Sequence, residues 1–149
     1  MFSKGIFLVA EKVVYSCNKT GIFFVFDQKG APLATMRTID QLPVPKLAKH
    51  EICPGYLVHG LEPDLRGNYS RGINQQHIFI LSNLLLPSYD NKRPVDVYDH
   101  LSKDYIFSFF LPNLDNGQMP DEISVDKDHL HVLYENGTIV KYLIKSVST

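Results

Sequence analysis

The sequence lacks the apolar runs that mark a membrane protein. An apolar run from Gly5 to Ala10, near the start of the chain, has only six residues. A membrane-spanning helix needs roughly 20 apolar residues, and no stretch of the chain approaches that length. Six residues are also too few for the core of a secretory signal peptide. We therefore expect no transmembrane segment here, and an export signal, if one exists, would lie upstream of Met1.

The chain also has almost no net charge and only two cysteines. Fifteen Lys and Arg residues against sixteen Asp and Glu residues leave a net charge of −1, which gives no electrostatic reason to expect a nucleic-acid partner. The only cysteines, Cys17 and Cys53, have no Cys-x-x-Cys spacing. Two cysteines cannot form a disulfide framework or a tetrahedral metal site, so we expect two free and largely buried thiols.

Helical periodicity is the third feature in short supply. The best helical candidate, about residues 40–50, is interrupted by Pro43 and Pro45. Short runs of β-branched and aromatic residues between turn residues are frequent instead, which is typical of an all-β fold. The predicted strands are residues 13–17, 22–27, 33–37, 78–82, 95–98, 105–111, 130–134 and 138–144.

Turn residues fit between these strands. Asn136-Gly137 predicts a hairpin with a type I′ turn, because both central residues of that turn need a positive φ. Asp27 and Asp99 each follow an aromatic residue at the end of matching strands. A catalytic pair of carboxylates is one interpretation. A structural role is the other interpretation, in which each carboxylate accepts hydrogen bonds from N–H groups of its turn. The recurrence of the two residues at equivalent positions favours this structural role.

The most informative pattern is an internal repeat. Residues 8–13, 73–78 and 125–130 align, each with an apolar residue, four mostly polar residues, and the first apolar residue of a strand. Residues 26–27 align with residues 98–99, and more loosely with the strand that contains Tyr142. The repeated unit is a small antiparallel sheet that is too apolar to stand alone, which is typical of the blades that stack in a β-propeller.

The predicted architecture is therefore a partial β-propeller of about three antiparallel four-stranded blades, the last one incomplete. We expect a single repeat-built unit over residues 1–149, with blade-like repeats at about 5–40, 73–113 and 122–146. Residues 41–72, rich in proline near their start, are predicted to be an insertion between the first two repeats.

These segments, most clearly residues 24–33, 95–109 and 130–144, resemble bacterial six-bladed β-propeller proteins with degenerate NHL-like repeats. The resemblance implies a periplasmic or cell-surface location if a signal peptide lies upstream. It implies no catalytic set, because such families share none. Three blades are half of six, so it also suggests a fragment of a longer protein or a subunit that self-associates to close a ring.

One stretch is the best candidate for ligand or partner binding. Residues 56–71 mix Tyr and Arg, the residues that anchor interfaces, with Gly and Pro of a predicted inter-blade loop. The residues expected to bind are Tyr56, His59, Arg66, Tyr69 and Arg71. The alternative is an ordinary crossing between blades.

Metal and cofactor signals are weak. His129 and His131 share one face of a predicted strand, but a third ligand would have to come from His77, His59 or Asp126, with no spacing to support it. The acidic residues between 121 and 128 lack the pattern of a calcium loop. We expect no metal site and no cofactor.

The sequence favours a non-enzymatic binding or scaffold module that recognises protein, peptide or glycan through its inter-blade loops. One alternative is a propeller-type hydrolase or lyase with its site at the central channel, and another is a fragment without a function of its own. An enzyme should gather titratable side chains with shifted pKa values at an opening. A scaffold should show an apolar or aromatic patch there or along an open blade face.

Overall fold

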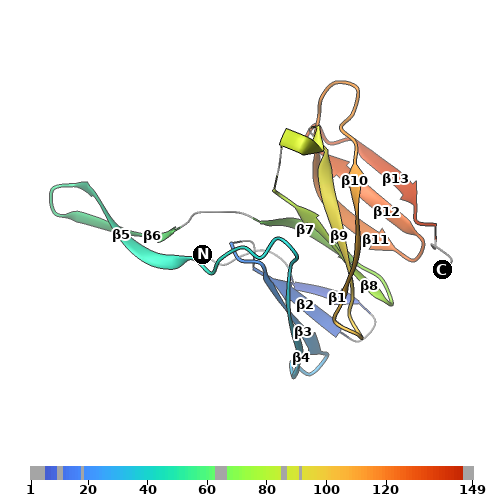
Figure 1. Ribbon diagram of the computed structural model, residues 1–149, viewed down its shortest axis with the longest axis horizontal. Helices are drawn as coiled ribbons and strands as arrows, with labels where there is room; N and C mark the ends of the chain where they lie inside the picture. Colours follow the sequence, from blue (N-terminus) through green and yellow to red (C-terminus); the bar gives the residue numbers. More distant parts are fainter. Residues whose placement is uncertain are drawn as a thin grey trace.

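The computed structural model describes residues 6–9, 12–17, 19–62, 67–84, 87–90 and 92–145, and this part of the chain is all-β. Its strands form four small antiparallel sheets, each made of strands consecutive in the chain (Figure 1). The helical content of the described residues is one short 3₁₀ turn, η1 (Pro87–Tyr89). None of their helices is long and apolar enough to cross a membrane.

The first and second sheets each have four strands in meander order. The first sheet contains β1 (Ile6–Val9), β2 (Lys12–Ser16), β3 (Ile22–Asp27) and β4 (Pro32–Arg37). The second sheet contains β7 (Asn68–Ile73), β8 (His77–Ser82), β9 (Arg93–Asp99) and β10 (Tyr105–Leu111). The insertion predicted over residues 41–72 is therefore too long, since β7 already belongs to the second sheet.

The third sheet has three strands in the described part of the chain, in the order β11-β12-β13. They are β11 (Pro120–Asp126), β12 (His129–Tyr134) and β13 (Ile139–Leu143). The first two sheets have a fourth strand beyond β3 and β9, whereas β13 is the edge of its sheet.

The fourth sheet is a two-stranded hairpin that projects from the rest of the molecule, and we call it the arm (Figure 1). It consists of β5 (Lys46–Cys53) and β6 (Tyr56–Glu62). Residues 40–50, where Pro43 and Pro45 interrupt the helical pattern, form no helix, and the predicted loop over residues 56–71 is mostly strand. Pro43 and Pro45 precede the arm and do not interrupt it.

The three larger sheets share one register at the aligned residues. Between the first two strands of each, Leu8 pairs with Val13, Ile73 with Ile78, and Val125 with Leu130. Between the next two strands, Val13 pairs with Phe26, Ile78 with Tyr98, and Leu130 with Tyr142. The sequence repeat therefore corresponds to a structural repeat, position by position.

The second sheet lies between the first and the third and packs against both. One core cluster joins Val14, Phe23, Val25 and Met36 of the first sheet to Ile73, Ile78, Ile80 and Tyr98 of the second. The other joins Phe79, Leu81, Val95, Val97 and Leu111 of the second sheet to Ile123, Leu130, Val132 and Tyr134 of the third. Consecutive residues of β8 and β9 are buried as a result, whereas β12 alternates between buried and half-buried residues.

The second and third sheets approach closely along β7 and β11. Ser70 Oγ accepts a hydrogen bond of 3.0 Å from the backbone N–H of Ile123. A Cβ atom added to Gly72 would lie only 2.5 Å from Val125 Cγ2 and 3.0 Å from the Val125 backbone nitrogen. Only glycine leaves room for this approach, because any side chain at position 72 would meet the neighbouring strand.

Two predictions about turns have different outcomes. In the Asn136-Gly137 turn only Gly137 has a positive φ, of 85°, so the predicted type I′ turn is wrong. The structural interpretation of the two recurrent aspartates is confirmed. Asp27 Oδ1 accepts from the N–H groups of Lys29 (2.9 Å) and Ala31 (2.7 Å). Asp99 Oδ1 accepts from those of Leu101 (2.7 Å) and Ser102 (3.0 Å).

Neither Cys17 nor Cys53 forms a disulfide, and, contrary to the prediction, neither is largely buried. Cys17 is half-buried, and Cys53 is exposed at the end of β5. Its exposure follows from its place at the free end of the arm.

Candidate binding surfaces

The five residues predicted to bind a ligand do not form one surface. Tyr56 (71% exposed) and His59 lie on β6 of the arm and face solvent. Tyr69 lies on β7, within the second sheet, and Arg66 lies outside the described residues. Arg71 is also on β7, but its side chain is only 3% exposed.

Arg71 belongs to the core between the first two sheets, so its assignment to a recognition surface is corrected. Its Nη1 donates a 2.7 Å hydrogen bond to Ser16 Oγ on β2. Burial lowers the pKa of the guanidinium from its usual value, because removing the charge from water is costly. A charged residue in a segment with Gly and Asn suggested a loop, and only the packing of the sheets places it inside.

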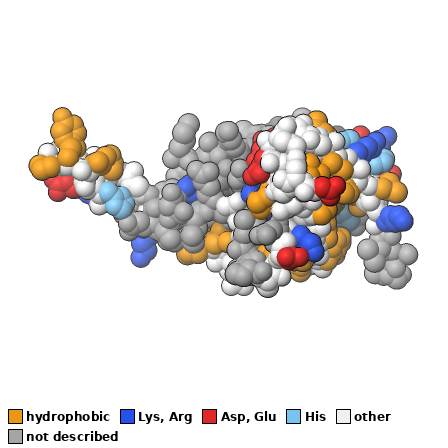
Figure 2. Space-filling model, turned by 90° about the horizontal axis from the view of Figure 1, so that it is seen from above, with side chains coloured by type: hydrophobic (Ala, Val, Ile, Leu, Met, Phe, Trp, Pro, Cys, Tyr) orange, Lys and Arg blue, Asp and Glu red, His pale blue; other side chains and the backbone are white. Residues whose placement is uncertain are grey.

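The arm exposes apolar side chains on both faces. Leu47, Ile52, Tyr56, Leu57 and Val58 are between 41% and 71% exposed. Figure 2 shows hydrophobic side chains gathered at the free end of the arm. None of the arm's residues belongs to either core cluster. An isolated two-stranded hairpin is only marginally stable in water. Exposed apolar patches often mark interaction sites, so the arm is a candidate surface for a partner.

Shifted titratable groups are found mainly in the core. Burial raises the pKa of the Asp96 carboxyl, against which a hydrogen bond from Ser108 acts, and burial also raises the pKa of Tyr98. Tyr98 Oη accepts a 2.9 Å hydrogen bond from the backbone N–H of Ile39. Asp96 and Tyr98 are 4% and 1% exposed, so neither presents a reactive group to a substrate.

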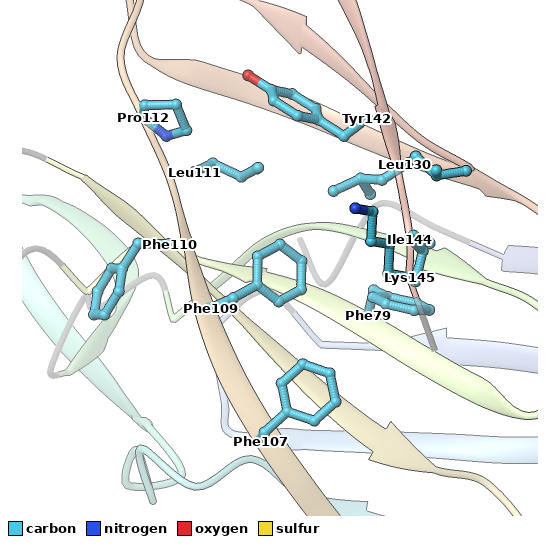
Figure 3. A pocket seen from close by; sticks show the side chains of 11 residues that line it. Phe79, Phe107, Phe109, Phe110, Leu111, Pro112, Leu130, Tyr142, Ile144 and Lys145 are labelled. Atoms are coloured by element: carbon cyan, nitrogen blue, oxygen red, sulfur yellow. The ribbon is translucent and has the colours of Figure 1, made fainter. Parts of the chain in front are cut away.

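An apolar groove lies between β10 and the end of β13 (Figure 3). Its volume is about 280 Å³. Three aromatic residues of β10, Phe107, Phe109 and Phe110, line it together with Tyr142 and Ile144 from the other side. Its remaining lining residues are Phe79, Leu111, Pro112, Leu130, Leu143 and Lys145. The groove therefore offers carbon surface and one ammonium group rather than a cluster of acids and bases.

The strand edge beside this groove carries unpaired positions. The N–H of Ile144 donates to the carbonyl of Asp128 (2.7 Å), and that of Tyr134 to the carbonyl of Thr138 (2.8 Å). Along an antiparallel strand, the backbone N–H and C=O groups face the paired strand at every second residue and face the opposite side at the residues between. The backbone groups of Ile139, Lys141 and Leu143 therefore point outward from β12, where the described residues supply no further strand.

No group of three metal-ligating side chains occurs among the residues that the structure describes. The rings of His129 and His131 have centroids 6.5 Å apart on β12. Of the third ligands considered, Asp126 pairs with His129 across β11 and β12, while His59 lies on the arm.

Comparisons with known proteins do not assign a family. No family model matches the chain, and no curated protein matches it. Among solved structures, it is similar to the computationally designed Ika4 protein, with 12% identity and a TM-score of 0.40 over 93% of this chain and 88% of that one. It is also similar to the computationally designed Ika8 protein, with 12% identity and a TM-score of 0.37, over 93% of this chain and 45% of that one.

The residues of the groove were not predicted as a site, although a signal was present. The aromatic run over residues 105–111 was predicted only as a strand. The signal was the incomplete last repeat predicted from the sequence. Among the described residues, the third sheet has no strand equivalent to β4 or β10, and aromatic side chains of β10 such as Phe107 (39% exposed) are only partly covered.

Proposed function

We propose that this chain is a non-enzymatic binding module, built from three blades of a β-propeller, that takes up an extended peptide segment as the fourth strand of its third sheet. The observation that carries the proposal is the apolar groove of about 280 Å³ that runs beside the open edge of β13. Addition of a strand to an exposed sheet edge is a recurrent mode of peptide recognition.

The position proposed for the peptide follows the strand order of the first two sheets. β4 pairs with β3, and β10 pairs with β9, on the side that is open at β13. A peptide at the same place in the third sheet pairs with the outward backbone groups of Ile139, Lys141 and Leu143. Main-chain hydrogen bonds then provide affinity for any extended segment, and the groove provides selectivity.

The side chains around the edge define the class of peptide. Alternate residues of an added strand point to opposite faces of the sheet. One set faces the groove, against Phe107 and Phe109, and is therefore apolar. The other set lies on the face of Lys141, where acidic residues gain a favourable cross-strand partner. The expected ligand is an extended segment that alternates apolar and polar residues, with acidic residues among the polar ones.

The lining of the groove favours a peptide over a glycan or an enzyme substrate. A glycan needs several convergent hydrogen-bonding groups, and a hydrolase or lyase needs an acid and a base. Tyr142 and Lys145 supply the polar side-chain atoms among the eleven lining residues, and aromatic and aliphatic carbon makes up most of the rest.

The test uses a library of random extended peptides displayed on phage and selected against the full chain. Enriched peptides are expected to alternate apolar and polar residues, and to lose at least about tenfold in affinity for Leu143→Pro. Proline removes the N–H group that a paired strand needs, and it is tolerated on edge strands. The matched control is Leu143→Ala, which removes the same side chain from the lining of the groove but keeps that N–H, and it is expected to lose less affinity than Leu143→Pro.

A second variant separates the groove from the edge. Phe107 is 39% exposed, so Phe107→Ser removes lining surface at little cost in stability. Binding by selected peptides is expected to weaken in this variant also. Peptides that bind Leu143→Pro as tightly as the original chain, or that lose affinity only when Tyr56 on the arm is changed, would refute the proposal.

A further inference from the structure

We infer that the outer face of the first sheet is the docking surface for the third sheet of a second copy of this chain. This inference concerns the faces of the outer sheets and not the edge of β13, so it does not depend on peptide binding.

The argument begins with the positions that the three sheets share. In the second sheet, Ile78, Ile80 and Tyr98 lie on the face that packs against the first sheet. In the third sheet, the equivalent residues Leu130, Val132 and Tyr142 lie on the face that packs against the second. This set of positions therefore covers the preceding sheet in both cases.

The first sheet carries the same set without a preceding sheet among the described residues. The equivalent residues are Val13, Tyr15 and Phe26, and they share a face with Ile22 and Phe24 because the residues between them are buried in the core. Phe24 packs on Tyr15 and Phe26, with ring centroids 6.4 Å and 6.3 Å apart. All five are half-buried, and neither core cluster includes any of them. This face has the composition of a blade interface.

The third sheet is the last of the stack among the described residues, and its outer face is of a different kind. Leu133 and Ile139, a cross-strand pair, occupy the positions of Leu81 and Val95 in the second sheet. The neighbouring pair, His131 and Lys141, replaces Phe79 and Val97. Ile139 and Leu143 on this face are 68% and 60% exposed. Two apolar residues remain exposed beside two cationic or protonatable ones.

These two faces complement each other. A third sheet stacked on the first sheet of another copy, in the manner of the third on the second, places Leu133 and Ile139 against the apolar residues of β2 and β3. It also places Lys141 and His131 against Tyr15, Phe24 and Phe26, and a cation over an aromatic face is a favourable contact. The aromatic face thus suits the mixed face better than it suits water.

The contact joins different faces of the two copies, so it is heterologous. Two copies close on themselves when each spans half of a ring. The three larger sheets of each copy give six in the dimer, within the usual range of four to eight blades in a propeller. The expected assembly is therefore a closed dimer with two identical interfaces.

The experiment is size-exclusion chromatography with light scattering on the full chain, over a wide range of micromolar concentrations. We expect a mass of twice 17.0 kDa for the original chain. Ile139→Glu is expected to give a monomer. Leu101→Glu is the matched control, since Leu101 is also 68% exposed but lies in the turn between β9 and β10, and it should remain dimeric. Tyr56→Ser, on the arm, should remain dimeric as well.

Variants of the first sheet complete the design. Phe24→Lys places an ammonium group on the aromatic face, opposite Lys141 and His131, and Thr35→Lys does so at an exposed position that pairs with Phe24. Thr35→Lys serves if the larger change impairs folding, which circular dichroism would report. Each is expected to be monomeric alone. A mixture of either first-sheet variant with Ile139→Glu should give a mixed dimer. One of the two interfaces in that dimer combines an unaltered first sheet with an unaltered third sheet.

The mixture decides between modes of association. A contact between two first sheets, or one made by the arms, would not be restored by mixing. An original chain that stays at 17.0 kDa at every concentration would overturn the inference. So would an assembly that Ile139→Glu leaves intact, or monomers that do not combine on mixing.

Discussion

Buried polar side chains tie the first sheet to the second. Arg71 on β7 donates to Ser16 on β2, and Tyr98 on β9 accepts from the backbone N–H of Ile39, which follows β4. Each of these contacts joins segments more than fifty residues apart in sequence. Since an unpaired buried polar group is costly, these bonds favour one arrangement of the two sheets over others of equal apolar area.

Arg71→Ala is predicted to lower the free energy of unfolding by about 3 kcal/mol, because it removes a packed side chain and leaves Ser16 without its partner. Tyr56→Ala, on the arm, is predicted to change it by less than about 0.5 kcal/mol, as is usual for exposed residues. Urea unfolding followed by circular dichroism measures both. Equal effects of the two changes would contradict the burial of Arg71.

Asp99 predicts a dependence of stability on pH. Hydrogen bonds from the backbone, first that of Ser102, lower the pKa of its carboxyl in the folded state. A lowered pKa stabilises the fold above the unfolded value of about 3.9, and this contribution disappears as the pH falls through the folded value. The difference in stability between the original chain and Asp99→Asn should be largest near neutral pH and shrink in acid. The urea midpoints of the two proteins would be compared near neutral pH and in acid. A difference of the same size under both conditions would contradict this prediction.

At the scale of the element, the close approach of β7 and β11 depends on one glycine. Gly72→Ala is predicted to destabilise the fold by about 2 kcal/mol, because the new methyl group meets Val125 and its backbone. Val125→Ala in the same chain should recover part of this loss by removing the nearest methyl group. Thermal unfolding of the two single variants and the double variant gives the coupling. Additive effects would show that the strands are not in contact at this point.

The arm is predicted to contribute little to the stability of the three-sheet body. Replacing residues 46–62 by a short Gly-Ser linker should change the unfolding midpoint by only a few degrees, since no arm residue belongs to a core cluster. Differential scanning calorimetry of the deleted and original chains provides the comparison. Loss of cooperative unfolding in the deletion would show that the arm supports the sheets.

Elements governed by local chemistry could be predicted from the sequence. The strand 22–27 and the turn at Asp27 follow from a continuous run of β-branched and aromatic residues and from a carboxylate that accepts from nearby N–H groups. β7 could not be predicted, because Asn68, Ser70, Arg71 and Gly72 have no preference for strands. Its pairing with β8 and its contact with β11 make it a strand. The arm was missed for a similar reason, since the prolines before it suggested a loop.

Across the molecule, the stacking of the sheets predicts how strongly each strand is protected from amide hydrogen exchange. β8 and β9 are buried on both faces, whereas the strands of the first and third sheets pack on one face. Amide hydrogen exchange should therefore be slowest in residues 78–82 and 95–98, and fastest in the arm. Exchange measured by mass spectrometry or NMR tests the order. Slower exchange in β12 than in β8 would contradict it.

The sequence repeat predicts the order of the three larger sheets along the chain, but it does not predict their open edges or outer faces. The aligned residues predicted which positions share a register, because the same apolar positions recur in each sheet. The open edge at β13 and the groove beside it depend on the strand order of the third sheet and on how it packs against the second. The partner at each outer face also depends on surfaces that only the assembled sheets create.

The pairing of Lys46 with Glu62 at the base of the arm has a consequence for chain entropy. Residues 38–67 connect the first sheet to the second, and a flexible loop of that length would cost more to close than a short one. The hairpin brings its own two ends together, so the connection closes as two short links rather than one long loop. Sequence added at the tip of the arm, beyond Cys53, would therefore leave the entropy of closing this connection nearly unchanged.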